Sequence, residues 1–160
     1  FPDQTYASTW CGKSGKENIC LHYFGAGHTN GDSIVHFQNS NIIHLGDLVF
    51  NRRHPYIDKT SGADISSWIK VLDKTIKTFD KKTQYICGHS GTGYDTIMKE
   101  DDLKAFAEYL DNLLKVVGQE IKAGKTQAEI LQLKEIPGSP EWKGDGIERP
   151  LKAAFQELAT

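Results

Sequence analysis

Short runs of apolar and β-branched residues dominate the first half of the chain and predict strands. We expect four of them, at 20–24, 33–37, 41–45 and 84–87. The cluster Asn39-Ser40-Asn41 is typical of a turn, so the second and third runs are predicted to form a hairpin. Residues 1–20 are polar and rich in turn formers, and we expect no strand before position 20.

In the second half of the chain, apolar residues recur every three or four positions, as in amphipathic helices. The pattern predicts helices at 64–79 and 101–117, with Gly118 ending the second. Capping boxes that begin at Ser61 and Thr126 mark the starts of the first helix and of a third one. This order of strands and helices indicates an α/β or α+β domain in which helices cover a sheet.

Length and charge narrow the classes of function. The 160 residues fit a single domain, 1–160, with a sizeable core. A net charge of −2 favours neither a nucleic-acid partner nor an anionic membrane. The apolar runs are too short to cross a bilayer and there is no targeting segment, so we expect a soluble chain of unknown compartment. Because it opens on Phe1, we expect it to be a piece of a longer, processed or cut protein.

The three cysteines form no metal-binding pattern. Cys11 and Cys20 could pair in an oxidising compartment. The odd count argues against a disulfide framework, so we expect reduced thiols.

Three apolar runs end at a glycine that is followed at once, or within three residues, by a potential metal ligand. His28 follows Gly25-Ala26-Gly27, Asp47 follows Gly46, and His89 follows Gly88. Ligands at strand ends can meet along one edge of a sheet, where α/β folds keep their sites. Two imidazoles and a carboxylate suit zinc or iron.

Each of these junctions also has a simpler interpretation. His28 could be incidental in a glycine-rich turn, and Asp47 could be a turn residue. If His28 is a ligand, Asp32 lies four residues later and could hold its ring by a hydrogen bond. We expect His22, His36 and His44 to be ordinary strand histidines.

A serine hydrolase is a competing interpretation of residues 88–93. Ser90 would be the nucleophile of a strand–turn–helix elbow, but the motif requires glycine where this chain has Thr92. All six histidines precede Ser90, so the later base that this enzyme class uses is missing. We therefore rank the metal interpretation above it.

The segment after Asp47 is a candidate substrate pocket. A loop that follows a ligand often lines the mouth of a site. Arg52, His54 and Tyr56 could bind a polar or anionic small molecule there. A solvated surface loop explains the same residues at least as well.

Together these motifs resemble the metallo-β-lactamase superfamily. The resemblance rests on Gly-x-Gly-His-Thr-x-Gly-Asp at 25–32, on a strand followed by Gly-Asp at 45–47, and on Gly-His at 88–89. The order and approximate spacing also agree. It covers about residues 20–115, and residues 118–160 would be a helical tail.

The resemblance implies a fold and a chemistry. The family fold is an αββα sandwich of two similar halves. His28 would bind a first metal, His89 a second, and Asp47, the catalytic residue, would bridge both, with Thr29 and Asp32 supporting the loop. The metal is usually zinc and sometimes iron. It generates a hydroxide that attacks an ester, thioester, lactone or phosphoester.

One departure from the family pattern is large. The earlier motif His-x-His-x-Asp-His is absent, so this chain resembles only the C-terminal half of the fold. The resemblance then implies a metal-dependent hydrolase whose site is incomplete here, so that this chain alone is inactive. Its open sheet face would need the missing N-terminal half or a second copy of this chain. A non-catalytic module that keeps the fold is the alternative. The aspartate at position 47 resembles the family branches that act on thioesters, lactones or phosphoesters, so the resemblance implies one of these substrates rather than a β-lactam.

Overall fold

The computed structural model describes residues 3–159 and contains one mixed sheet. Its six strands lie in chain order: β1 (Thr9–Ser14), β2 (Glu17–His22), β3 (Ile34–Phe37), β4 (Ile42–Asn51), β5 (Gln84–Ser90) and β6 (Ile97–Met98). All neighbours are antiparallel except β4 and β5, which are parallel. Parallel neighbours need a crossover connection, and helix α1 (Ile65–Thr78) lies within it.

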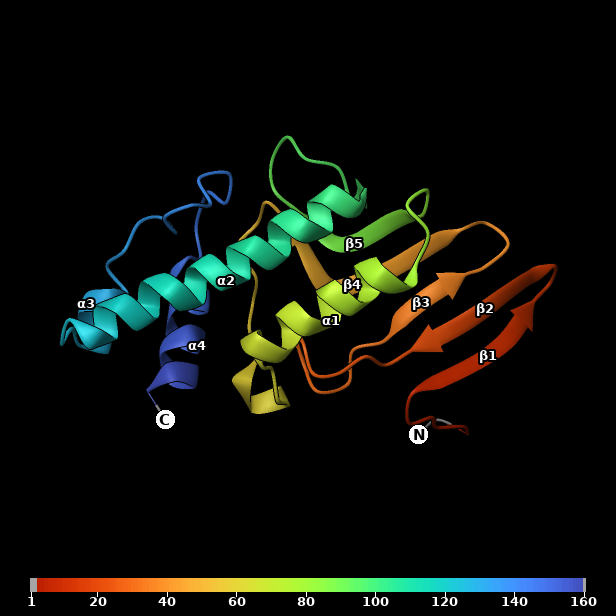
Figure 1. The fold of residues 1–160 in the computed structure, drawn as a ribbon, viewed down its shortest axis with the longest axis horizontal. Helices are drawn as coiled ribbons and strands as arrows, with labels where there is room; N and C mark the ends of the chain where they lie inside the picture. The colour runs from red at the N-terminus through yellow and green to blue at the C-terminus, as the bar shows by residue number, and fades with distance from the viewer. Residues whose placement is uncertain (1–2, 160) are drawn as a thin grey trace.

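Helices cover one face of this sheet. Helix α1 lies beside the long helix α2 (Glu100–Lys122), and both cross the same face (Figure 1). The fully buried side chains come from both helices and from the central strands, and include Trp68, Leu72, Phe106, Ile43 and Tyr85. The expected α/β arrangement, with helices covering a sheet, is confirmed. No helix within residues 3–159 combines the length and apolar character needed to cross a bilayer.

The other face of the sheet carries a row of mainly apolar side chains. The row crosses all six strands in register and consists of Trp10, Leu21, Val35, His44, Ile86 and Ile97. Trp10 is 38% exposed and Ile97 is 56% exposed, while Leu21, Val35 and Ile86 are half-buried. We call these six residues the open-face row.

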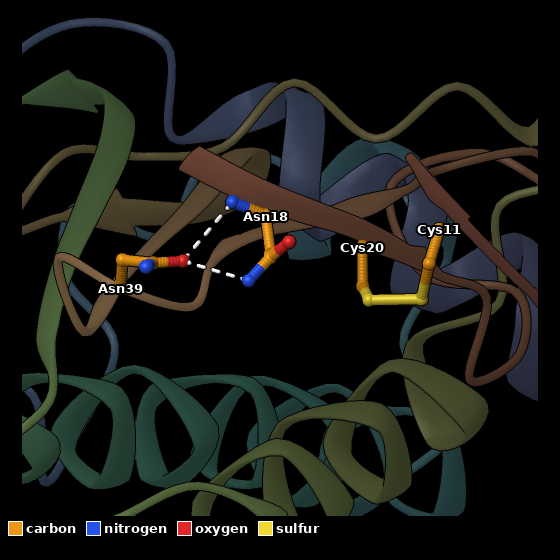
Figure 2. Close-up of a disulfide and its surroundings, with 4 residues drawn as sticks. All are labelled: Cys11, Asn18, Cys20 and Asn39. Atoms are coloured by element: carbon orange, nitrogen blue, oxygen red, sulfur yellow. Dashed lines mark hydrogen bonds between the residues drawn. A yellow bond between two sulfur atoms is a disulfide. The ribbon is translucent and has the colours of Figure 1, made fainter. Parts of the chain in front are cut away.

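The start of the sheet differs from the prediction. Residues 9–22 form the hairpin of β1 and β2, in which Cys11 and Cys20 lie opposite each other and form a disulfide (Figure 2). Reduced thiols were therefore the wrong expectation for this pair. The turn-rich sequence concealed β1, and without β1 nothing indicated that the two cysteines face each other. Asn39, in the next turn, accepts hydrogen bonds from the backbone and side chain of Asn18.

Two helix boundaries also differ. Helix α2 continues through Gly118 to Lys122, and the left-handed residue that follows it is Gly124. A glycine inside a helix costs only about 1 kcal/mol, which the buried face of α2 offsets. Asp64, rather than Ser61, caps α1 and accepts a hydrogen bond from the backbone of Ser67. The capping box at Thr126 is confirmed and starts the short helix α3 (Gln127–Ile130).

A carboxylate from the last helix also caps α1. Glu157, on α4 (Glu148–Leu158), accepts hydrogen bonds from the backbone nitrogens of Ile65 (2.8 Å) and Ser66 (3.0 Å). It also pairs with Lys59, the first residue of the short 3-10 helix η1 (Lys59–Ser61). Burial alone would raise the pKa of Glu157, but these donors outweigh it and lower the pKa below the usual value. The negative charge suits the helix N-terminus.

Replacing Glu157 tests this tertiary cap. We expect Glu157→Gln to lower the free energy of unfolding by about 1–3 kcal/mol at neutral pH, because charged acceptors form the stronger hydrogen bonds. A lowered native pKa stabilises the fold above the pKa of the unfolded chain, and this stabilisation is lost as the pH falls through the native pKa. The gap between wild type and variant should therefore close in acid.

Urea unfolding over a range of pH measures this gap. Glu135→Gln, at an exposed position, is the matched control and should change little. Equal stability of wild type and Glu157→Gln at neutral pH would contradict the proposed cap, as would a gap that persists in strong acid.

Candidate metal centre

A change of register in β4 presents Asp47. Gly46 has a left-handed backbone (φ 52°), and the pairing of β4 with β5 shifts on both sides of it. The regular alternation of side chains is interrupted, as at a β-bulge, and Leu48 and the two residues after it are all buried. The indole nitrogen of Trp68 donates to the carbonyl of Leu48 (2.9 Å) and holds this segment against α1.

The loop between β2 and β3 presents His28. Asp32 organises it by accepting hydrogen bonds from the backbone nitrogen of Thr29 (2.7 Å) and from its hydroxyl (3.1 Å). Gly27 is buried, and a Cβ there would lie 2.6 Å from Leu48. Glycine at this position therefore lets the loop approach β4.

Backbone hydrogen bonds connect the same loop to the start of α1. The amide of Asp64, the α1 cap, donates to the carbonyl of Gly27 (3.2 Å), and the amide of Asn30 donates to Ser61 (2.9 Å). The position of His28 thus depends on where α1 begins.

His89 lies near the end of β5. Its ring stacks on Phe50 at 5.0 Å, and Phe50 also lies 5.9 Å from the ring of His28. The preceding residue must be small, because a Cβ on Gly88 would lie 2.3 Å from a carboxylate oxygen of Asp47. Gly88 therefore leaves space for the carboxylate of Asp47, and the next residue, His89, supplies the imidazole.

Two of the three predicted ligands, His28 and His89, lie close to the third, the carboxylate of Asp47. His28 Nε2 is 3.9 Å from Asp47 Oδ2, and His89 Nε2 is 3.4 Å from Asp47 Oδ1. Each histidine faces a different oxygen. Within residues 3–159, no three histidine, cysteine or carboxylate side chains form a group that could hold a metal ion. The arrangement is two histidine–carboxylate pairs that share Asp47.

Acidic neighbours dominate the electrostatics of His28. Its Nδ1 lies 3.6 Å from Asp32 Oδ1, and its side chain is only 14% exposed. The interaction with Asp32 raises the pKa of His28 above the usual value, with smaller contributions from the charges of Asp47 and Asp58, although burial opposes the shift. With Nδ1 facing Asp32, Nε2 is the nitrogen on the Asp47 side.

The predicted pocket residues lie in different environments. Tyr56 is exposed, and its ring lies 6.5 Å from that of His28. His54 is buried beside the Tyr109 hydroxyl (3.0 Å), and burial lowers its pKa. Arg52 pairs with Asp102. A role for these residues in binding substrate stays a prediction.

The sequence did not identify several neighbours of the site. The rings of Phe50 and Trp68 both lie 5.9 Å from the ring of His28, and no motif in the sequence indicates this contact. Arg149, on α4, lies over the ring of Tyr56 at 5.9 Å. No local motif could link a residue this late in the chain to the site.

The sequence of this chain is similar to that of one curated protein. The chain is 27% identical over 94 residues to the metallo-beta-lactamase type 2 of Bacteroides fragilis. The match covers 59% of this chain and 37% of that protein, so the chain spans little more than a third of the relative. No family model matches the chain.

Solved structures give the evidence for the fold. The match to a metallo-beta-lactamase from Pontibacter korlensis has a TM-score of 0.58 and 22% sequence identity. It covers 69% of this chain and 49% of that protein chain. The match to the stereoselective inverting sec-alkylsulfatase Pisa1 from Pseudomonas sp. has a TM-score of 0.72 and 13% sequence identity. It covers 95% of this chain and 26% of that protein chain. Taken with the curated relative, these structures show that the chain has the fold of the metallo-β-lactamase superfamily.

Proposed function

We propose that this chain is the C-terminal part of a metal-dependent hydrolase of the metallo-β-lactamase superfamily. The observation that carries the proposal is the position of Asp47, whose two oxygens face His28 and His89 separately. A carboxylate that spans two neighbouring ions would be placed in this way. The relatives' names, a β-lactamase and an alkylsulfatase, are those of hydrolases.

The residues present fit part of a zinc site. Imidazole nitrogens and carboxylate oxygens are common zinc ligands. His28 has a carboxylate on its Nδ1 side, the usual arrangement behind a histidine that binds metal through its other nitrogen. Gly88 leaves space for Asp47 to lie between the histidines. Three donors are too few for a dinuclear centre, so further ligands must come from elsewhere.

The residues of this chain would hold and orient the metal. His28 would bind one zinc ion and His89 a second, with Asp47 contacting both; iron is the alternative metal. Bound zinc activates water and stabilises developing negative charge, the chemistry that hydrolysis of an ester, thioester, lactone or phosphoester needs. Phe50 and Trp68 exclude water from one side of His28. Tyr56 lies close enough to the His28 ring to contact a substrate.

We also propose a partner for the uncovered side of the sheet. The relatives are two to four times longer than the part of them that this chain matches. The open-face row is apolar and partly exposed, and an apolar area of this kind marks an association site. The remaining half of the fold would cover it and would supply the missing ligands.

Metal binding gives the first test. We expect the purified chain to bind zinc, and Asp47→Asn to weaken that binding by more than about tenfold, because the variant loses a charged ligand. Asp73→Asn, an exposed change on α1, is the matched control and should bind as wild type does. Calorimetric titration measures both. Wild-type affinity in Asp47→Asn would contradict the proposed ligand set.

The incomplete ligand set predicts low activity for this chain alone. In the isolated chain, the first metal would be held only by His28 and Asp47, so zinc can bind but lacks the three or more protein ligands that a catalytic zinc site normally has. A panel of carboxylic, thio-, phospho- and alkyl sulfate esters, with zinc added, should show little turnover. Turnover comparable with that of an intact enzyme would contradict this prediction.

The open-face row predicts association. We expect the isolated chain to bind a hydrophobic dye and to self-associate in sedimentation experiments. Ile97→Lys, at the exposed end of the row, should reduce both effects without unfolding the chain. Leu158→Lys changes an exposed apolar residue on α4 and is the matched control. A stable monomer that binds no dye would contradict the proposed partner surface.

Two other functions remain testable alongside this one. A non-catalytic module would keep the fold but purify without metal and bind none. A serine hydrolase would label at Ser90 with a fluorophosphonate probe. The shared carboxylate of Asp47 favours the metal hydrolase over both.

A further inference from the structure

We propose that Arg52 is a positioning residue that fixes the direction of His89. Its function in catalysis rests on the proposed role of His89 as a metal ligand. The sequence suggested instead that Arg52 binds substrate. In the folded chain Arg52 instead contacts Asn51 and Asp102, which fits a role in positioning the loop after β5.

Asn51 connects the end of β4 to the loop that follows His89. Its backbone carbonyl accepts a hydrogen bond from the amide of Gly91 (2.7 Å). Its side-chain nitrogen donates to the carbonyl of Asp95 (2.8 Å). Asn51 is 4% exposed, so these bonds are shielded from water. Both ends of the segment 91–95 are thus attached to one residue of β4.

Arg52 in turn holds Asn51. Its Nη1 donates to the side-chain oxygen of Asn51 (2.8 Å) and to Asp102 Oδ1 (2.6 Å). The other oxygen of Asp102 accepts from the backbone nitrogen of Lys99, so this carboxylate is itself fixed at the start of α2. The guanidinium therefore connects the loop after β5 to a long, buried helix.

The backbone at Arg52 is also unusual. Arg52 has a left-handed conformation (φ 54°), which side chains other than glycine rarely adopt. A Cβ on Gly91 would lie 2.3 Å from the carbonyl oxygen of Arg52, so the two backbones are in close contact. Such strain persists only where the surroundings enforce it. Here the enforcing contacts are the ion pair with Asp102 and the rings of Tyr94 and Trp142, which lie within 5.5 Å of the guanidinium carbon.

These contacts leave little of Arg52 for a ligand. Its side chain is 14% exposed, and its Nε is buried without a partner. The network acts instead on the segment that begins two residues after His89. His28 lies on a different loop, which Asp32 and the start of α1 hold. A defect at Arg52 should therefore move His89 and leave His28 in place.

Substitution of Arg52 by lysine tests this role in the metal-free chain. Arg52→Lys keeps the charge but loses the planar guanidinium, whose Nη1 donates to both Asn51 and Asp102. We expect the Gly91 amide to exchange with solvent about tenfold faster, and the ring NMR signals of His89 to shift while those of His28 stay unchanged. Asp102→Asn removes the negative charge at the other end of the same contact and should change the same signals in the same direction. Arg53→Lys, at the exposed next residue, is the matched control and should change nothing.

The outcomes separate this proposal from the hydrolase proposal. A folded Arg52→Lys variant with unchanged His89 signals and unchanged Gly91 exchange would overturn the positioning role. Equal changes at His28 and His89 would also overturn it, because they would indicate general destabilisation. If the wild-type chain binds no zinc, the hydrolase proposal fails. The exchange and ring measurements, made without metal, would still decide the role of Arg52.

Discussion

The geometry of the candidate site depends on one break in strand β4. The left-handed turn at Gly46 shifts the register of β4 against β5 and places Asp47 between two histidines from other segments. In a regular strand successive side chains point to opposite faces, and the register shift at Gly46 interrupts this alternation just before Asp47. The hydrogen bond from Trp68 to Leu48 then fixes this break against helix α1. A strand irregularity next to a functional site is a common way to aim a side chain.

The two histidines reach Asp47 through separate supports. His28 depends on the start of α1, which Asp64 caps from its own segment and Glu157 caps from the last helix. His89 depends on the end of β5 and on the loop attached to Asn51. Both rings meet at Phe50, which packs between the site and the core. Residues from almost the whole length of the chain thus contribute to the position of one carboxylate.

The sequence predicted the parts of this structure that depend on local pattern. His28, Asp47 and His89 follow apolar strands and glycines, so the pattern alone was enough to expect them at one sheet edge. The helices at α1 and α2 followed from their apolar spacing, because a buried helical face repeats every three to four residues. Strand β1 was missed because its exposed, polar residues lack such a pattern, and without it the possible pairing of Cys11 with Cys20 was ranked below reduced thiols. The hydrogen-bond partners of His54 and Arg52 are Tyr109 and Asp102, about fifty positions later in the chain, so no local pattern could reveal these contacts.

We propose that the carboxylate of Asp47 organises a metal site between the β2–β3 loop and the end of β5. Crystals of the longer hydrolase to which we propose that this chain belongs, grown with zinc and measured at the zinc absorption edge, test this most directly through an anomalous difference map. The account predicts density beside Asp47, within bonding distance of His28, of His89 or of both. Strong zinc density elsewhere in the protein, with none beside Asp47, would contradict it.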